Sequence, residues 1–493
     1  MILKPTIKAN ERDAMPAING TAAAETAGAA RTTAAAPSAK TGHVSLEGVH
    51  NTIEVPHHQA GFWQQWRAFV GPAILVSVGY MDPGNWGTDL QGGAQYKYGL
   101  LWVVGLASLI AIFMQVISAR LGVVTGKDLA QCCRDWYPEW TRWPNWLMSE
   151  LAIGACDLAE VLGSAVALNL LFHIPLLWAV IITGLDVLLL LALQGFGMRT
   201  IEALVLLLIV TIGVCYFIEI FILPATQPNF LEMGRALLLP SLRHAGMIYI
   251  AIGIIGATVM PHNLYLHSAL VQSRQLQKDE PSIRRAIQFN TIDSIVALTI
   301  AFFVNAAILV LAATVFFGKH SVTVISGQVV TFSANSDWIR VAYLTLAPLL
   351  GTAAASTLFA VALLASGQSS TITGTLAGQV VMEGFMHWRI KPWVRRLITR
   401  TLAILPAVLI IGLRGESSVT DLLTLSQVVL ALQLPFAMFP LLHFTSSRAR
   451  MGRWKNGAFL LAAGWASAIL ITAMDVYGLP DSIRAAWQVV VGG

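Results

Sequence analysis

The sequence has very little charge. Asp, Glu, Lys and Arg make up 12% of its 493 residues, whereas soluble domains carry about 25%. Apolar residues account for 56% of the chain. This composition excludes an ordinary soluble domain and indicates a protein that crosses a membrane several times. The net charge of +5 is no sign of nucleic-acid binding, because Lys and Arg lie mostly in short connections between apolar runs.

Cysteine is also scarce, and its spacing includes no C-x-x-C pair. Because two of the cysteines fall in apolar runs, neither a disulfide framework nor a zinc site is expected. The cysteines are Cys132, Cys133, Cys156 and Cys215.

A nucleotide-binding loop is absent as well. The stretch Gly-Gln-Ser-Ser-Thr-Ile-Thr-Gly at 367–374 has no Gly-Lys-Ser/Thr, and we expect it at the cytoplasmic end of a helix rather than after a strand. No ATP hydrolysis, no nucleotide partner and no cofactor are therefore expected.

The first sixty residues differ from the rest of the chain. Residues 20–41 are mostly Ala, Thr, Gly and Ser, and they include no apolar core. No positively charged region followed by a hydrophobic block is present, so a secretory signal is not expected. We expect residues 1–60 to form a disordered cytoplasmic tail.

Eleven apolar runs are long enough to cross a bilayer, which takes about 20 residues. Lys and Arg are far more frequent in the even-numbered connections between them, which predicts that these connections are cytoplasmic. The N-terminus would then lie inside and the C-terminus outside. The runs are 67–97, 100–123, 147–171, 175–195, 201–223, 244–273, 290–317, 338–370, 397–413, 420–443 and 457–477.

The first run is interrupted by Asp82-Pro83-Gly84-Asn85. Pro83 removes a backbone donor and disturbs the preceding turn. Asp82 at hydrocarbon depth costs about 2.5–3.5 kcal/mol on insertion scales. Irregular backbone survives at that depth only where protein or a water-lined cavity surrounds it. The segment therefore predicts a helix that is unwound around a site.

The sixth run is interrupted in the same way, at Met260-Pro261-His262-Asn263. Runs one and six each open a set of five, and two repeats of five spans have opposite orientations. Matched broken helices are the best sequence pointer to a transporter site at the membrane midplane. We expect an all-α, leucine-transporter-like 5+5 inverted repeat over 61–225 and 240–445, with an eleventh helix at 455–480.

The two interruptions offer a mixed set of donors. Asp82 provides a carboxylate, Asn85 an amide oxygen and Met260 a thioether, and unwound backbone near Ala257 can provide a carbonyl. Hard cations such as Mg²⁺ gain little from sulfur, whereas a thioether favours softer metals. Mn²⁺ or Fe²⁺ would fit as transported substrates, and Cd²⁺ as an intruder. A methionine in a membrane helix could also serve only in packing. Asp186 in run four could equally be a structural hydrogen-bonding partner.

Five ordered motifs resemble one family. Gly-Tyr-Met-Asp-Pro-Gly-Asn at 79–85 and Met-Pro-His-Asn-Leu-Tyr-Leu-His-Ser at 260–268 resemble the first- and sixth-helix signatures of the Nramp (natural resistance-associated macrophage protein) divalent-metal transporters. Asp-Leu-Ala-Glu-Val-Leu-Gly at 157–163, the stretch at 367–374 and Ser-Gln-Val-Val-Leu at 426–430 resemble the same family. The resemblance spans about 62–477 and leaves the N-terminal tail outside.

The resemblance implies proton-coupled import of Mn²⁺ and Fe²⁺ across a bacterial inner membrane by alternating access. It places Asp82, Asn85, Met260 and the Ala257 carbonyl on the metal, and it adds Gln427 in some conformations. Relatives that handle Mg²⁺ depart from the family at the methionine, so Met260 favours the transition-metal branch. The partners expected are divalent ions, protons and the lipid bilayer, and the protein is expected to be a monomer.

Proton coupling needs groups that titrate, and Asp82 is one of them because metal binding favours its charged form. Asp157 and Glu160 lie three apart on one helix face, and two buried carboxylates need cationic partners or shared protons. Arg400 is the expected partner, with Arg395 or Arg396 as alternatives. The pair could be only a buried ion-pair network, but the resemblance implies a polar path from Asp82 to the cytoplasm.

Two histidines follow the sixth-run interruption. His262 could relay protons near the site, whereas His267 is expected to be structural.

Three other functions remain open at this point. A Mg²⁺-type carrier on the same fold would not need the sulfur of Met260. An amino-acid symporter of the same architecture would bind a substrate carboxylate, which an anionic Asp82 would repel. A metal channel or a metal sensor without turnover also remains open. Metal uptake that saturates and responds to a pH gradient would distinguish a carrier from both.

Overall fold

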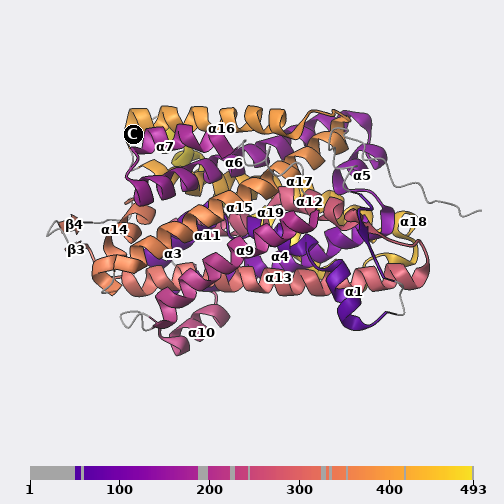
Figure 1. Cartoon of the computed structure of the whole chain (residues 1–493), viewed down its shortest axis with the longest axis horizontal. Helices are drawn as coiled ribbons and strands as arrows, with labels where there is room; N and C mark the ends of the chain where they lie inside the picture. The colour runs from indigo at the N-terminus through magenta and orange to yellow at the C-terminus, as the bar shows by residue number, and fades with distance from the viewer. Residues whose placement is uncertain are drawn as a thin grey trace, which may run out of the picture. The chain divides into compact units, whose positions relative to one another are not determined.

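The structure, a computed structural model, describes residues 50–56, 60–186, 198–222, 228–242, 245–323, 329–331, 336–350, 353–415 and 418–490. Its described elements are almost all helices (Figure 1). The elements before the second broken helix are β1 (Ile53–Glu54), α1 (Phe62–Phe69), α2 (Pro72–Gly79), α3 (Pro83–Tyr96), α4 (Leu101–Thr125), α5 (Leu129–Trp136), η2 (Glu139–Thr141), α6 (Arg142–Phe172), α7 (Leu176–Ile182), η3 (Thr183–Leu185), α9 (Met198–Phe217), the π-helix η4 (Ile218–Ile222) and α10 (Phe230–Leu238).

The second half begins with another pair of helices that meet at a break. The elements are α11 (Ala245–Val259), α12 (Pro261–Leu270), η5 (Val271–Ser273), β2 (Arg274–Gln275), α13 (Glu280–Val315), β3 (Ser321–Thr323), β4 (Val329–Thr331), α14 (Trp338–Leu350), α15 (Ala353–Met386), α16 (Pro392–Arg414), α17 (Val419–Ser446), α18 (Arg448–Met451), η7 (Gly452–Trp454) and α19 (Ala458–Val490).

Within the described residues, nine helical stretches are long and apolar enough to cross a membrane. Together with the composition, they confirm a polytopic membrane protein. They correspond to expected runs two, three and five to eleven. The stretches are Leu101–Thr125, Glu139–Phe172, Arg199–Ile222, Gly246–Ser273, Glu280–Val315, Ala354–Met386, Pro392–Leu413, Val419–Ser446 and Ala458–Gln488.

The first and fourth runs are absent from these nine for different reasons. The first run is divided into α2 and α3, which are each too short to count alone. The fourth is described only as far as Asp186, as α7 and η3, and its remainder lies outside the described residues. The interruption expected at Asp82 is therefore confirmed.

The expected eighth run, 338–370, was wrong. Residues 338–350 form the separate helix α14, and the long helix α15 continues to Met386. The stretch at 367–374 thus lies inside a helix instead of at its cytoplasmic end. Its polar side chains have partners: Ser370 donates to Glu160 over 2.8 Å, and Thr375 to the Thr371 carbonyl over 2.8 Å. A helix satisfies its own backbone at any depth, so polar side chains with partners need not end it.

The boundary expected at residue 60 was placed too late. Ile53 and Glu54 form a parallel pair with Arg274 and Gln275, and the Asn51 amide donates to the Gln272 carbonyl over 3.0 Å. Residues 1–49 and 57–59 of the expected tail lie outside the described residues.

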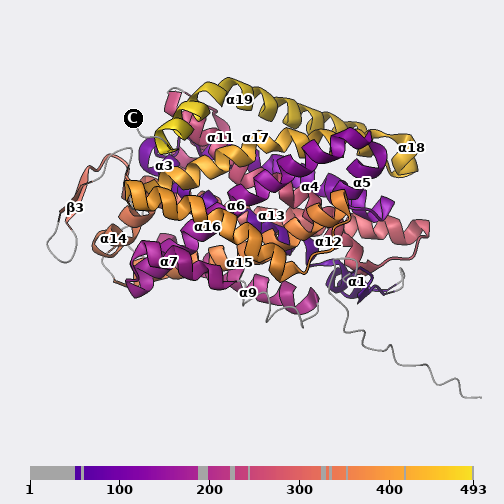
Figure 2. The same ribbon diagram turned by 90° about the horizontal axis from the view of Figure 1, so that it is seen from above.

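The helices around the two breaks pack against one another. In Figure 1, α3 and α11 lie within the bundle, where α3 packs on α13 and α11 packs on α17. Helix α6 packs on α15. Figure 2, the view from above, shows α19 lying along α17 at one edge. The side chains of both breaks are buried at the centre of this packing.

Candidate metal site

The first break is built by local backbone chemistry. Pro83 occupies the first position of α3, where its missing N–H would have no helical partner. Asp82 caps the helix: its Oδ1 accepts from the Asn85 backbone N–H over 2.9 Å. Asp82 Oδ2 is buried and has no hydrogen-bond partner among the described residues. Capping thus uses one carboxylate oxygen and leaves the other for a ligand.

The second break centres on Met260, where Pro261 opens α12. Met260 has φ of +41°, a left-handed conformation that non-glycine residues rarely adopt. Its thioether accepts from Asn263 Nδ2 over 3.5 Å. A Cβ on Gly79 would lie 3.2 Å from Met260 Sδ, so the sulfur lies directly against the end of α2. The break therefore aims the thioether at the first broken helix.

Asn85 joins the two breaks. Its Nδ2 donates to Asp82 Oδ1 over 2.8 Å and to the Ala257 carbonyl over 3.1 Å. Its Oδ1 accepts from Asn305 Nδ2 over 3.2 Å and from Thr258 Oγ1 over 3.5 Å. The partly positive amide thus bridges two oxygens that a cation would also bind.

Gln427 lies against the first turn of α3. A Cβ on Gly84 would come within 1.9 Å of Gln427 Nε2, so only glycine leaves room for this side chain. Its Nε2 donates to Ser426 Oγ over 3.0 Å, whereas its Oε1 is buried without a hydrogen-bond partner among the described residues. Buried oxygens without donors are costly, so Asp82 Oδ2 and Gln427 Oε1 both suit a cation.

The arrangement brings together the residues expected on the metal: Asp82, Asn85, Ala257, Met260 and Gln427. In the part of the chain that the structure describes, no group of three or more His, Cys, Asp or Glu is placed to hold a metal ion. A cation here would depend on carboxylate, amide, carbonyl and thioether donors. Sequence reasoning missed Asn305, because a single asparagine on a long apolar helix carries no motif.

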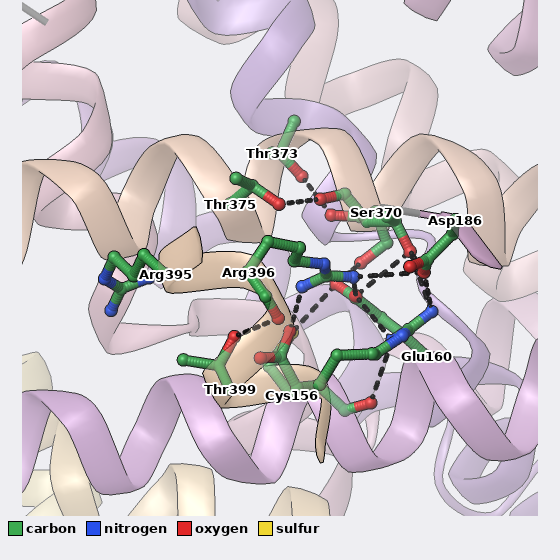
Figure 3. A network of polar contacts seen from close by, with 12 residues as sticks. Cys156, Glu160, Asp186, Ser370, Thr373, Thr375, Arg395, Arg396 and Thr399 are labelled. Carbon is green, nitrogen blue, oxygen red and sulfur yellow. Dashed lines mark hydrogen bonds and ion pairs between the residues drawn. The ribbon is translucent and has the colours of Figure 1, made fainter. Parts of the chain in front are cut away.

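A buried charge network lies beside the first break (Figure 3). Arg396 on α16 forms ion pairs with Asp157, through a short contact, and with Glu160 over 2.9 Å. Arg400 pairs with Asp186 through another short contact, and its Nη1 lies 3.5 Å from Glu160 Oε2. Three carboxylates thus share two guanidinium groups.

The pairing differs from the expectation that Arg400 is the main partner. Arg396 takes Asp157, Arg400 takes Asp186, and Glu160 contacts both arginines. Arg395 instead pairs with Glu150 over 2.7 Å. Asp186, which looked isolated in the sequence, belongs to the network.

Helix α15 connects this network to the first break. Ser366 Oγ donates to the Met81 carbonyl over 2.5 Å, and Ser370, one turn later, donates to Glu160. A Cβ on Gly163 would lie 2.1 Å from Pro83 Cβ, so α6 also packs directly on the break. Polar side chains on one face of α15 therefore contact both Met81 at the first break and Glu160 in the charge network.

The two histidines of α12 have different surroundings. His262 is buried, and its Nδ1 has no hydrogen-bond partner among the described residues. His267 Nδ1 lies 2.9 Å from Gln115 Oε1, and Gln115 Nε2 donates to Tyr80 Oη over 2.6 Å. His267 thus stabilises packing between α12, α4 and the first break, which agrees with a structural role.

Comparisons with known proteins agree on one family. A family model described as natural resistance-associated macrophage protein-like (Nramp) matches residues 73–481. The chain is 51% identical over 446 residues to the divalent metal cation transporter MntH of Nostoc sp., covering 89% of this chain and 96% of that protein. It is 47% identical over 437 residues to MntH of Listeria monocytogenes serotype 4b, covering 88% and 94%.

Solved structures give the same result. A crystal structure of a variant of the Eremococcus coleocola manganese transporter has a TM-score of 0.79 and 38% identity, covering 90% of this chain and 92% of that one. The nucleobase-cation-symport-1 family transporter MHP1, at 12% identity and a TM-score of 0.52, is similar in fold alone, over 85% and 92% of the two chains.

Proposed function

The chain belongs to the Nramp family, and from this premise we propose that it imports Mn²⁺ and Fe²⁺ together with protons by alternating access. Its relatives are named divalent metal cation transporters and a manganese transporter, which supports a transporter rather than an enzyme. Cd²⁺ would enter by the same site. No cofactor is needed, because the metal is the cargo and the proton the co-substrate.

The donor set at the two breaks carries this proposal. Asp82 supplies the single negative charge, and the Asn85 amide, the Ala257 carbonyl and Gln427 Oε1 supply neutral oxygen. Met260 supplies sulfur, which hard cations do not need and softer divalent metals accept. Binding requires Asn85 to turn its oxygen inward, since its Nδ2 now donates to Asp82 and Ala257.

The charge network supports a proton path. Metal binding favours ionised Asp82, so its proton must leave. The hydroxyls of α15 lead from Met81 towards Glu160, where three carboxylates share two arginines. In this proposal Asp157 and Glu160 carry the proton towards the cytoplasm, Arg400 and Arg396 balance the charge of these carboxylates along the path, and His262 assists near the site.

We also propose eleven membrane spans in a 5+5 inverted repeat with one added helix. The matched breaks, each followed by a proline at the first helical position, support this arrangement. The distribution of Lys and Arg supports a cytoplasmic N-terminus and an external C-terminus, and the bacterial relatives support a plasma-membrane location. A monomer holds every residue of the site.

Uptake by reconstituted vesicles tests the proposal. Mn²⁺ influx into vesicles that contain the full chain should saturate, and it should increase when the outside is made acidic. A divalent ion moving inward gains roughly 4.6 kcal/mol per 100 mV of inside-negative potential, so potential and pH gradient are varied separately. Absence of uptake beside a working Mn²⁺ transporter would overturn the proposal.

Substitution of Met260 by alanine separates a transition-metal carrier from a Mg²⁺ carrier. We expect Met260→Ala to reduce the preference for Mn²⁺ over Ca²⁺ and Mg²⁺ about tenfold, because the remaining donors are oxygens. Competition of Ca²⁺ and Mg²⁺ with Mn²⁺ uptake measures the preference. Met451→Ala, at the end of α18 and outside both breaks, is the matched control. Unchanged preference in Met260→Ala would contradict the role of sulfur.

Substitution of Asp157 by asparagine tests the proton path. Asp157→Asn should reduce metal-driven proton influx several-fold while the Mn²⁺ affinity changes less than about twofold, because Asp157 pairs with Arg396 and not with the metal donors. A pH-sensitive dye inside the vesicles reports proton influx, and calorimetry of the purified protein reports binding. Equal loss of both would count against a separate path.

A further inference from the structure

Asp89 in α3 is a buried carboxylate that the proposed mechanism does not use. It is 1% exposed, and neither carboxylate oxygen has a hydrogen-bond partner among the described residues. Buried charges are normally paired or bound to a metal ion. Asp89 is therefore a position where this conformation leaves a cation-binding group unsatisfied.

Asp89 lies midway along α3. It follows Asp82 by seven residues and precedes Tyr96 by seven, which is about two turns or 10 Å along the axis in each direction. It lies four residues after Asn85, so both project from the same face of the helix. A cation that moved along this face would reach Asp89 before Asn85 and Asp82.

The neighbours of α3 show where this face points. Asn85 contacts Asn305 on α13, and a Cβ on Gly93 would lie 2.2 Å from the Leu309 carbonyl. Helix α13 thus packs tightly on this face and closes it between Asp89 and the outer end of α3 in this conformation. Thr88 lies against Gly253 of α11. Asp89 thus lies at the level between the two α13 contacts, one residue after the contact with α11.

The same three helices border a surface hollow at their outer end. Its lining includes Gln95 and Tyr96 from α3, Met247 from α11 and Phe317 just after α13. Lys97 at its edge is paired with Glu232 over 2.7 Å, and Arg235 adds one further positive charge. The hollow, Asp89 and Asp82 therefore follow one another along α3.

We propose that Asp89 is an outer station for the divalent cation, occupied between the hollow and the site at Asp82. Asn305, which contacts Asn85 one turn before Asp89, has a further buried oxygen, Oδ1, without a hydrogen-bond partner among the described residues. The inference rests on the proposed function, since it requires inward movement of a metal ion from the outer end of α3.

The test compares entry with binding, using Mn²⁺ and the full chain. Asp89→Asn should raise the KM for Mn²⁺ uptake into vesicles about tenfold, leave the maximal rate within about twofold, and leave the Kd in detergent within about twofold. Asp89→Glu, which keeps the charge, should keep the KM within about threefold of wild type. An unchanged KM in Asp89→Asn, or an equal rise of KM and Kd, would overturn the proposal that Asp89 is an outer station for the cation.

Asp475→Asn on α19 is the matched control, because it also removes a buried carboxylate with an unpartnered oxygen. Its KM should equal that of wild type. If Asp89→Asn does not fold, Asp89→Ser, which removes the charge, is compared with Asp89→Glu, which keeps it. Equal KM values for Mn²⁺ uptake in these two variants would overturn the proposed cation station at Asp89. Failure of the wild-type chain to take up Mn²⁺ would instead overturn the proposed function.

Discussion

Replacement of Asp82 by asparagine should reduce Mn²⁺ uptake at least a hundredfold. Asp82 is the single charged donor at the two breaks, and removal of one partner from a buried charge pair costs about 3–5 kcal/mol, where every 1.4 kcal/mol corresponds to tenfold in affinity. Calorimetric titration of the purified variant with Mn²⁺ and uptake into vesicles measure the two expected losses.

The substitution should leave the local fold intact. Asparagine caps a helix about as well as aspartate, so the Asp82 contact with the Asn85 backbone N–H can be kept. Asp82→Asn should therefore elute and melt like the wild type. Asp421→Asn, in the first turn of α17, removes a carboxylate without touching the site and should transport normally. Uptake by Asp82→Asn above a tenth of the wild-type rate would exclude Asp82 as the principal ligand.

Replacement of Arg396 by methionine should destabilise the protein by about 3–5 kcal/mol, because it leaves buried carboxylates without their cation. Arg396 contacts Asp157, Glu160 and Asp186, and its side chain is 1% exposed. The thermal midpoint of the purified protein in detergent should fall accordingly. Proton influx in vesicles should also fall, since the proposed proton path would lose its central cation.

Two comparisons separate charge from packing. Arg395→Met breaks a pair whose partner Glu150 is 20% exposed, and it should cost much less. Adding Asp157→Asn and Glu160→Gln to Arg396→Met removes the unpaired charges and should recover part of the lost stability, but not proton coupling. Equal effects of Arg396→Met and Arg395→Met would contradict a special role for the buried network.

Helix α15 shows where sequence patterns mislead in a membrane protein. The stretch at 367–374 was expected at a helix end, because the eighth apolar run was placed at 338–370 and its polar residues lie at the end of that run. The partners of these polar residues come from α6 and from the helix itself, through Ser370 with Glu160 and Thr375 with the Thr371 carbonyl. Those on α6 become visible only once α6 and α15 are packed together.

The sequence by itself determined the membrane class, the two breaks and the family. The apolar composition favours a membrane over water wherever the residues lie in the fold. Pro83 and Pro261 interrupt the backbone within one helical turn, so the two breaks do not depend on distant contacts. Asp82, Asn85 and Met260 of the proposed donor set followed from the same local motifs, because they lie within or next to the breaks themselves.

Only the tertiary structure decided which groups meet. Which of Arg395, Arg396 and Arg400 pairs with Asp157 depends on the rotation of α16 against α6. Arg396 and Asp157, the residues that do pair, are 239 residues apart in the sequence. Side chains three or four residues apart point in different directions on a helix that packs on one face, and no local pattern selects among them. The same packing brought Asp186 into the network and left Asp89 without a donor.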